Sequence, residues 1–203
     1  MTVTKDAQIR RLVSFRGEDM NQSNNPSAVR SRKEITGALL KLMEDQPYRE
    51  ISVKQIILET DLVRRTFYRN YESKDDVLDS IITDKILEYA EELALTPGSP
   101  LDVIFRFCEK NKDFLLLLHK NDLLYLLLLK LNIMIPNLQQ VIDRNNNPFA
   151  MIIGELEPDY IIAFNVGAVW NVIFKWVERG MTDSADEIKE TLAEYLTRMK
   201  PFT

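Results

Sequence analysis

The sequence contains a single cysteine and a single histidine among its 203 residues. The lone Cys108 cannot form an internal disulfide, and we therefore expect a reducing, cytoplasmic setting. One histidine and one cysteine are too few for a zinc cluster, and the sequence has no glycine-rich phosphate loop. Acid–base catalysis uses a pair of carboxylates in an apolar environment, and no such pair is evident among the protein's many carboxylates. These shortages predict that the protein is not an enzyme and holds neither a cofactor nor a metal.

Long hydrophobic runs are also missing. The longest ones, 114–118 and 123–129, are far shorter than the roughly 20 residues that a membrane-spanning helix needs. Charged and polar residues are spread through 1–26, so we expect no signal peptide there. We interpret both runs as buried helix and predict no membrane partner.

The apolar residues follow a helical pattern. No segment alternates apolar and polar residues over the length of a strand, whereas spacings of three and four residues recur between clear breakers. The sequence therefore predicts an all-α fold, with a three-helix helix-turn-helix domain followed by a larger helical bundle. Helices are expected from Ser27 up to Pro47 and then over 53–60, 63–70, 74–95, 101–112, 113–119, 122–143, 149–154, 157–179 and 185–199. Ser52, Ser73 and Ser184 are predicted N-caps.

Charge is divided unevenly along the chain. Residues 1–75 carry 14 lysines and arginines against 11 acids, a net charge of +3, whereas residues 76–203 carry 12 against 20, a net charge of −8. A basic N-terminal part joined to an acidic remainder indicates that a polyanion binds the N-terminal part. We expect a DNA-binding domain over 27–75 and a helical regulatory and dimerisation domain over 76–203.

The first 26 residues lack a helical apolar period and end in a polar run. This composition predicts a disordered or loosely attached arm. Met20 offers an alternative start, which would make 1–19 an appendage. As a further alternative, Arg10, Arg11 and Arg16 contact DNA from the arm.

Two short helices joined by about three residues, 53–60 and 63–70, give the strongest functional signal, because this is the geometry of a helix-turn-helix. On the second helix, Phe67 and Tyr71 share the inward face. The remaining surface carries arginine, threonine, tyrosine and asparagine, which suit the major groove of DNA. These predicted DNA-binding residues are Arg64, Arg65, Thr66, Tyr68, Arg69 and Asn70. Lys54 and Lys74 flank them as predicted phosphate contacts. The alternative is an ordinary solvated basic helix.

Residues 30–82 resemble the DNA-binding domain of TetR-family transcriptional regulators. The resemblance rests mainly on the core T-F-Y-x-x-Y-x-x-K at 66–74. It implies that Thr66, Tyr68 and Asn70 contact DNA and that Lys74 meets a phosphate. It also implies that Ser52 and Lys54 lie near the DNA backbone.

Two residues depart from the family pattern. The family has glycine in the turn and serine or threonine at the cap of the recognition helix, where this chain has Asp61 and Val63. Aspartate tolerates a left-handed turn conformation at modest cost. Valine cannot cap, which predicts a loss of roughly 1 kcal/mol and a recognition helix that frays more easily.

Residues 158–179 are apolar nearly all round, apart from a polar strip at Asn171, Lys175 and Glu178. Packing on a single core needs only one apolar stripe, so we predict that a second face packs on another subunit. The alternative is the central helix of a monomer. The predicted dimer-interface residues are Ala163, Gly167, Trp170, Phe174, Leu192 and Tyr195. TetR-like proteins are similar, because their last two helices form a four-helix dimer interface.

The leucine-rich region 114–135 matches helices that enclose a ligand cavity in the same family. His119, Tyr125 and Asn132 are the predicted ligand-pocket residues. The alternative is that each is a surface residue or a core residue whose polar groups are satisfied.

Together these features predict a homodimeric regulator that binds near-palindromic double-stranded DNA and acts as a repressor. A two-fold dimer places its recognition helices about one DNA turn apart, ~34–36 Å. By the resemblance, a small-molecule ligand shifts the helix 74–95, changes this separation and releases the operator. The alternative is a regulator or interaction module on the same fold, controlled by a protein partner without a small-molecule effector.

Overall fold

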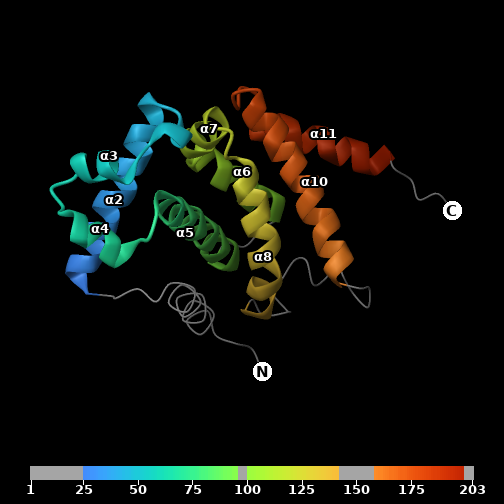
Figure 1. The fold of residues 1–203 in the computed structure, drawn as a ribbon. Coiled ribbons are helices and arrows are strands. Elements are labelled where there is room, and N and C mark those ends of the chain that lie inside the picture. Colours follow the sequence, from blue (N-terminus) through green and yellow to red (C-terminus); the bar gives the residue numbers. More distant parts are fainter. Residues whose placement is uncertain (1–24, 96–99, 142–157, 199–203) are drawn as a thin grey trace.

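The computed structural model describes residues 25–95, 100–141 and 158–198, and every regular element within these ranges is helical. The predicted all-α class is confirmed (Figure 1). The elements are α2 (Pro26–Asp45), the 3-10 turn η1 (Tyr48–Glu50), α3 (Val53–Leu58), α4 (Arg64–Asn70), α5 (Lys74–Leu95), α6 (Pro100–Lys110), α7 (Lys112–Lys120), α8 (Tyr125–Val141), α10 (Pro158–Glu178) and α11 (Ala185–Arg198). The predicted arm and the predicted short helix 149–154 lie outside the described residues.

Three serines begin helices as their positions in the sequence predict. Ser52 accepts a hydrogen bond from Gln55 N at 3.3 Å, and the Gln55 side chain accepts one from Ser52 N at 2.9 Å. Such a capping box satisfies two N–H groups that a helix start leaves without partners. Ser73 caps α5 by accepting from Asp76 N, and Ser184 caps α11 by accepting from Glu187 N.

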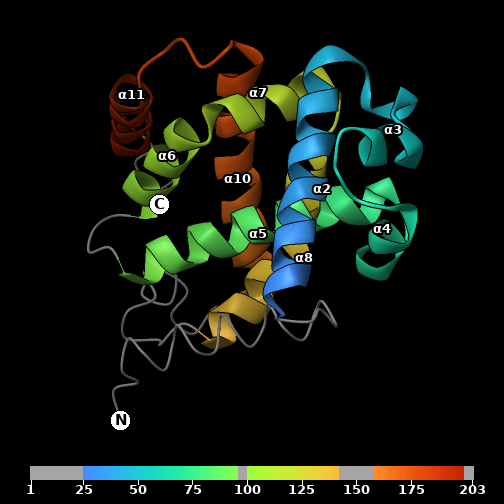
Figure 2. The ribbon, with the colours of Figure 1, turned by 90° about the vertical axis from the view of Figure 1, so that its left-hand side faces the viewer.

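The helices form two groups that share α5. In the first group, α3 and α4 both pack on α2. In the second, α8 packs on α5 and α10, α7 packs on α10, and α11 packs on α6. Figures 1 and 2 show the result: α3 and α4 lie at one end of the molecule and α11 lies at the other. The surfaces predicted for DNA binding and for dimerisation are therefore far apart.

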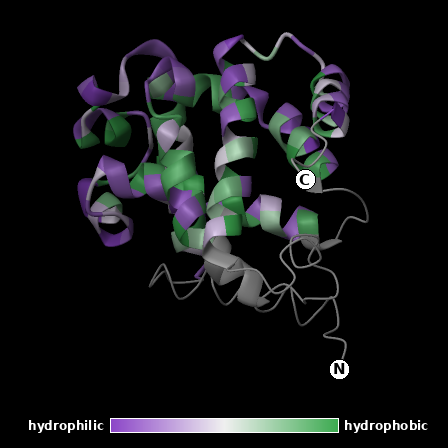
Figure 3. Cartoon of the chain, turned by 90° about the vertical axis from the view of Figure 1, so that its right-hand side faces the viewer, coloured by the Kyte–Doolittle hydropathy of each residue, from purple (hydrophilic) through white to green (hydrophobic). Residues whose placement is uncertain are grey.

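The hydrophobic core is continuous between the two groups. It runs from Ile35 and Phe67 near α4 to Trp176 on α10. Hydrophobic residues gather where the central helices pack, and hydrophilic residues predominate around α3 and α4 (Figure 3). Cys108 lies in this core, where burial raises the pKa of its thiol to about 12. A neutral, buried thiol is a small core residue and not a nucleophile. None of the described helices is long and apolar enough to cross a membrane.

Candidate nucleic-acid interface

The core fixes the orientation of the short helix α4. Phe67 is fully buried, and Tyr71 ends the helix with its ring buried and its hydroxyl 3.3 Å from Ser80 Oγ. These two residues form the inward face, as predicted from their i,i+4 spacing. A helix of two turns has little stability of its own, so this burial is what holds α4 in place.

The opposite face of α4 is open to solvent. Arg64, Arg65, Tyr68 and Arg69 are exposed, as predicted. Thr66 and Asn70 are half-buried at the border, also as predicted. The structure therefore places the six predicted side chains around one outward surface at the edge of the molecule.

The side chains of Arg64 and Tyr68 on this face contact each other. The Arg64 guanidinium lies 5.4 Å from the centre of the Tyr68 ring, and its Nη2 is 3.4 Å from the Tyr68 hydroxyl. A cation above an aromatic ring is attracted by the ring's electrons. The contact restricts both side chains before any DNA is present.

Three cations of this surface are uncompensated. Within the part of the chain that the structure describes, Lys54, Arg65 and Arg69 make no ion pair and no hydrogen bond, whereas the nearby Lys41 is paired with Glu59 at 2.5 Å. A positive charge without an internal partner is free to neutralise a phosphate or to donate to a base edge. We define Arg64, Arg65, Tyr68 and Arg69 of α4, together with Lys54 of the adjoining α3, as the α4 face.

Two of the predicted contacts have part of their hydrogen-bonding capacity engaged. Asn70 donates from Nδ2 to Thr66 O at 2.7 Å, which leaves its Oδ1 and one N–H for an adenine edge. Ser52 is exposed, but its hydroxyl also serves the capping box of α3. Both residues stay next to the α4 face with reduced freedom.

The ammonium of Lys74 is engaged inside the protein. Its ammonium donates to Tyr48 O at 2.7 Å, Ile51 O at 2.8 Å and Arg49 O at 3.3 Å, and it lies 4.5 Å from the centre of the Tyr48 ring. An ammonium has three donors, and all three are used inside the protein. The phosphate contact stays a prediction, and a phosphate would have to displace one of these backbone carbonyls. In this structure Lys74 joins the start of α5 to η1.

The two departures from the family pattern have different outcomes. Val63 occupies the N-cap of α4 and makes no side-chain cap, as predicted. Asp61 does not adopt the left-handed conformation, because Asp122 and Met181 are the only non-glycine residues with positive φ in the described ranges. The expected backbone cost at Asp61 is therefore absent, and the missing cap remains the weakness of this turn.

Restoring the cap is expected to stabilise the protein. Val63 is 68% exposed, so the change Val63→Ser sacrifices little apolar burial. A serine at this position supplies an acceptor for the first-turn N–H groups, and we expect the free energy of unfolding to rise by about 1 kcal/mol. Urea denaturation measures it. The matched control Ser52→Ala removes an existing cap and should lower the same quantity by about 1 kcal/mol.

The surface predicted for dimerisation is largely exposed, with one exception. Ala163 and Tyr195 are exposed, and a side chain added at Gly167 would meet no atom within 4 Å. Trp170, in contrast, is only 7% exposed and belongs to the protomer's own core, so it adds little to the exposed surface of α10. Phe174 and Leu192 are half-buried. The exposed face is rotated away from Trp170.

Three large apolar residues that are not among the predicted interface residues also lie on this surface. Tyr160 is 79% and Phe164 is 73% exposed on α10, and Leu196 is exposed on α11. Tyr160 and Phe164 lie at i and i+4, one turn from Ala163 and Gly167, so helical spacing contained the signal. An apolar surface left open in this way is typical of an interaction site.

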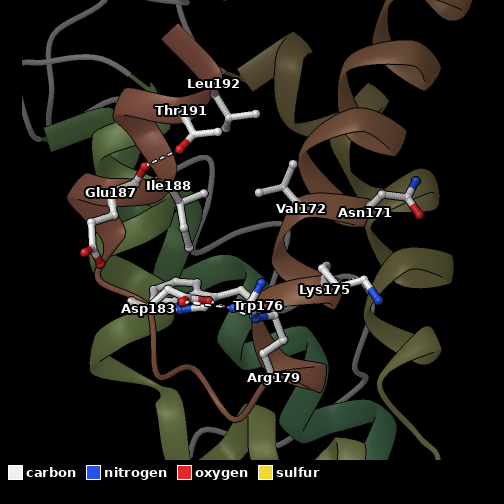
Figure 4. A pocket seen from close by; sticks show the side chains of 10 residues that line it. All are labelled: Asn171, Val172, Lys175, Trp176, Arg179, Asp183, Glu187, Ile188, Thr191 and Leu192. Carbon is white, nitrogen blue, oxygen red and sulfur yellow. Dashed lines mark hydrogen bonds and ion pairs between the residues drawn. The ribbon is translucent and has the colours of Figure 1, made fainter. Parts of the chain in front are cut away.

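A groove of about 570 Å³ separates α10 from α11 (Figure 4). Its apolar walls are formed by Val172, Trp176, Ile188 and Leu192, which the two helices contribute from opposite sides. Arg179, paired with Asp183 at 3.1 Å, lies at its edge. The groove thus provides a largely apolar surface, open to solvent, beside the exposed face of α10.

The predicted ligand-pocket residues are not brought together. His119 lies edge-on to Phe174, with ring centres 6.2 Å apart. Tyr125 and Asn132 are exposed on the outer side of α8, where Asn132 donates to Leu128 O of its own helix. These three side chains therefore do not converge on one cavity in the described part of the chain. Among the described residues, no three His, Cys, Asp or Glu side chains gather in the arrangement that a metal ion needs.

A family model matches residues 97–198, which are 102 of the 203 residues. The model is of TetR type and is described as the transcriptional regulator C-terminal region. No curated protein matches the chain. The match covers α6 to α11, whereas the T-F-Y motif lies on α4, so two separate parts of the chain point in the same direction.

Proposed function

The chain belongs to the TetR family of transcriptional regulators, and we propose that it is a homodimer that binds a near-palindromic DNA operator through α4 and represses transcription. The observation that carries this proposal is the α4 face. It combines Arg65 and Arg69 of α4 with Lys54 of α3, three cations without internal partners, and an arginine stacked on a tyrosine of α4, the short helix that Phe67 anchors. These groups suit phosphate contact and readout of guanine in the major groove. We assign this role to the helices within 27–75, and regulation and dimerisation to 76–203.

Dimerisation is supported by the open surface on α10 and α11. The exposed residues Tyr160, Phe164 and Tyr195 would be covered by the equivalent surface of a second copy. The α10–α11 groove provides an apolar surface on which such a copy would pack. Two copies related by a two-fold axis would present two α4 faces to one duplex, with recognition helices ~34–36 Å apart or at a related spacing.

A charge placed on this surface is expected to weaken the dimer. Phe164→Glu leaves the protomer folded, because the side chain is exposed, but buries a carboxylate in the dimer. We expect the dissociation constant of the dimer to rise by roughly 100-fold, since burying an unpaired charge costs several kcal/mol. Sedimentation velocity over a dilution series measures it. Leu58→Glu, at an equally exposed position on α3, is the matched control and should leave the dimer unchanged.

For the release of DNA, we propose a small-molecule effector that binds the C-terminal helices and favours one arrangement of the two α4 faces over another. A specific observation also favours a second candidate, control by a protein partner. Tyr125, Leu129 and Ile133 form an apolar stripe at i, i+4 and i+8, exposed on α8. Native mass spectrometry of the purified protein separates the two, because a retained small molecule supports the first and a co-purifying protein the second.

Selection from a pool of random DNA tests the proposed function. The purified protein should enrich one near-palindromic sequence, and a variant with Arg64→Ala and Tyr68→Ala should enrich none. Enrichment of a single half-site by a monomer would contradict the dimer but preserve DNA binding. If the wild-type protein enriches no sequence from the pool, the proposal itself is overturned.

A further inference from the structure

The turn between α7 and α8 contacts the helix-turn-helix group directly. Asn121, which follows the last residue of α7, accepts a hydrogen bond from Tyr48 N at 2.7 Å through Oδ1. Its Nδ2 donates to Met43 O at 3.3 Å and to Leu117 O at 3.0 Å. The neighbouring Lys120 donates to Glu44 O at 2.6 Å. Two consecutive residues of the regulatory part thus bind the end of α2.

The end of α2 needs such partners. The last carbonyl groups of a helix accept no hydrogen bond from N–H groups of the same helix, so their donors must come from elsewhere. Here the carbonyls of Met43 and Glu44 find them in Asn121 and Lys120, some 75 residues further along the chain. The turn itself is fixed, because Asp122 adopts a left-handed conformation (φ 59°) and Leu123 N bonds back to Leu118 O. A rigid turn that caps a distant helix holds that helix at a defined angle.

The contacts continue from this turn towards α4. Tyr48, whose N–H binds Asn121, donates from its hydroxyl to Asp75 at 2.5 Å, and its carbonyl accepts from Lys74. Lys74 and Asp75 are the first residues of α5, four or five positions after the end of α4. In the other direction, α7 packs on α10, where His119 meets Phe174. One connected series of contacts therefore runs from α10 through Asn121 to the start of α5, which follows the recognition helix α4 in the chain.

We propose that Asn121 is a positioning residue that sets the separation of the two recognition helices in the dimer. This inference rests on the proposed function, because it needs a dimer that joins through α10 and binds DNA through α4. Asn121 belongs neither to the α4 face nor to the exposed surface of α10 and α11. It fixes the angle of α2, and with it α4, relative to the helix that carries the dimer surface. A change at this turn alters the spacing of operator half-sites that the dimer accepts.

Operators of altered spacing test this role. The selected operator is compared with versions that carry one base pair more or one fewer at the centre. The wild type should bind the selected spacing at least about tenfold more tightly than either, because one base pair displaces and rotates a half-site. In Asn121→Ala we expect affinity for the selected operator to fall about tenfold and the preference for spacing to shrink to about threefold or less.

A matched control variant isolates the contact between the two helix groups. Asn132→Ala removes an asparagine that donates to the carbonyl four residues earlier, as Asn121 does, but that binds nothing in α2 or η1. It should change neither affinity nor spacing preference. Lys120→Ala provides a second test at an exposed position, where unfolding is not expected. It should reduce the preference for spacing in the same direction, by about threefold.

The outcomes separate this inference from the proposed function. Unchanged spacing preference in both Asn121→Ala and Lys120→Ala overturns the positioning role, and so does an equal loss of affinity at all spacings. If circular dichroism shows Asn121→Ala to be unfolded, Lys120→Ala alone decides. A wild type that selects no sequence at all overturns the proposed function instead.

Discussion

Replacing Arg65 and Arg69 together by alanine is expected to lower affinity for the selected operator roughly 100-fold at physiological salt, because each lost contact costs about 1–3 kcal/mol. Both side chains are exposed and make no ion pair within the described residues, so their removal leaves the fold intact. The plot of log affinity against log salt concentration should become shallower by about two, since roughly one counterion is released per neutralised phosphate.

A control with the same change in charge excludes a general electrostatic effect. Arg106→Ala with Lys110→Ala removes two cations from α6, where they pair with Glu92 at 3.4 Å and Glu88 at 2.6 Å. These residues lie away from the α4 face, and the salt dependence of binding should not change. Fluorescence anisotropy over a salt series measures both variants. Equal losses in the two double variants would show that net charge, and not the α4 face, governs binding.

Replacing Lys74 by glutamine is expected to lower the free energy of unfolding by at least about 3 kcal/mol, since hydrogen bonds from a charged donor contribute about 1.5–3 kcal/mol each and three carbonyls lose this donor. The carbonyls belong to Tyr48, Arg49 and Ile51, in the turn between α2 and α3. The contact of the ammonium with the Tyr48 ring is lost as well. Urea denaturation followed by circular dichroism measures the change.

This result distinguishes a structural lysine from a phosphate contact. Lys54→Gln, at an exposed position without internal partners, should change stability by less than about 0.5 kcal/mol while weakening DNA binding. If Lys74→Gln behaves in the same way as Lys54→Gln, with normal stability and a shallower salt dependence, the assignment of Lys74 to the turn is wrong.

The orientation of α4 could be predicted because helical spacing determines it. Phe67 and Tyr71 are large, apolar and one turn apart, so only one rotation of a short helix buries both. Once that rotation is fixed, the exposed positions of Arg65, Tyr68 and Arg69 follow. The three serine caps were predictable for a similar reason, since the serine side chain reaches an N–H three residues further along its own backbone.

The sequence is least informative where the answer depends on distant parts of the chain. Helix α10 is apolar on most of its surface, so its sequence does not define which apolar side faces the core, and the burial of Trp170 could not be predicted from it. The role of Lys74 depends on where η1 directs its carbonyls. The contacts of Asn121 join residues more than 70 positions apart, and nothing in the local sequence of 117–123 signals them.

The central claim is that the α4 face of a dimer reads DNA sequence and does not merely attract phosphates. The ratio of dissociation constants for the selected operator and for a scrambled duplex of the same composition, measured at physiological salt, tests it most directly. Specific recognition predicts that the operator binds about 1,000-fold or more tightly than the scrambled duplex. Equal affinities for the two duplexes would contradict the claim and reduce α4 to an ordinary basic helix.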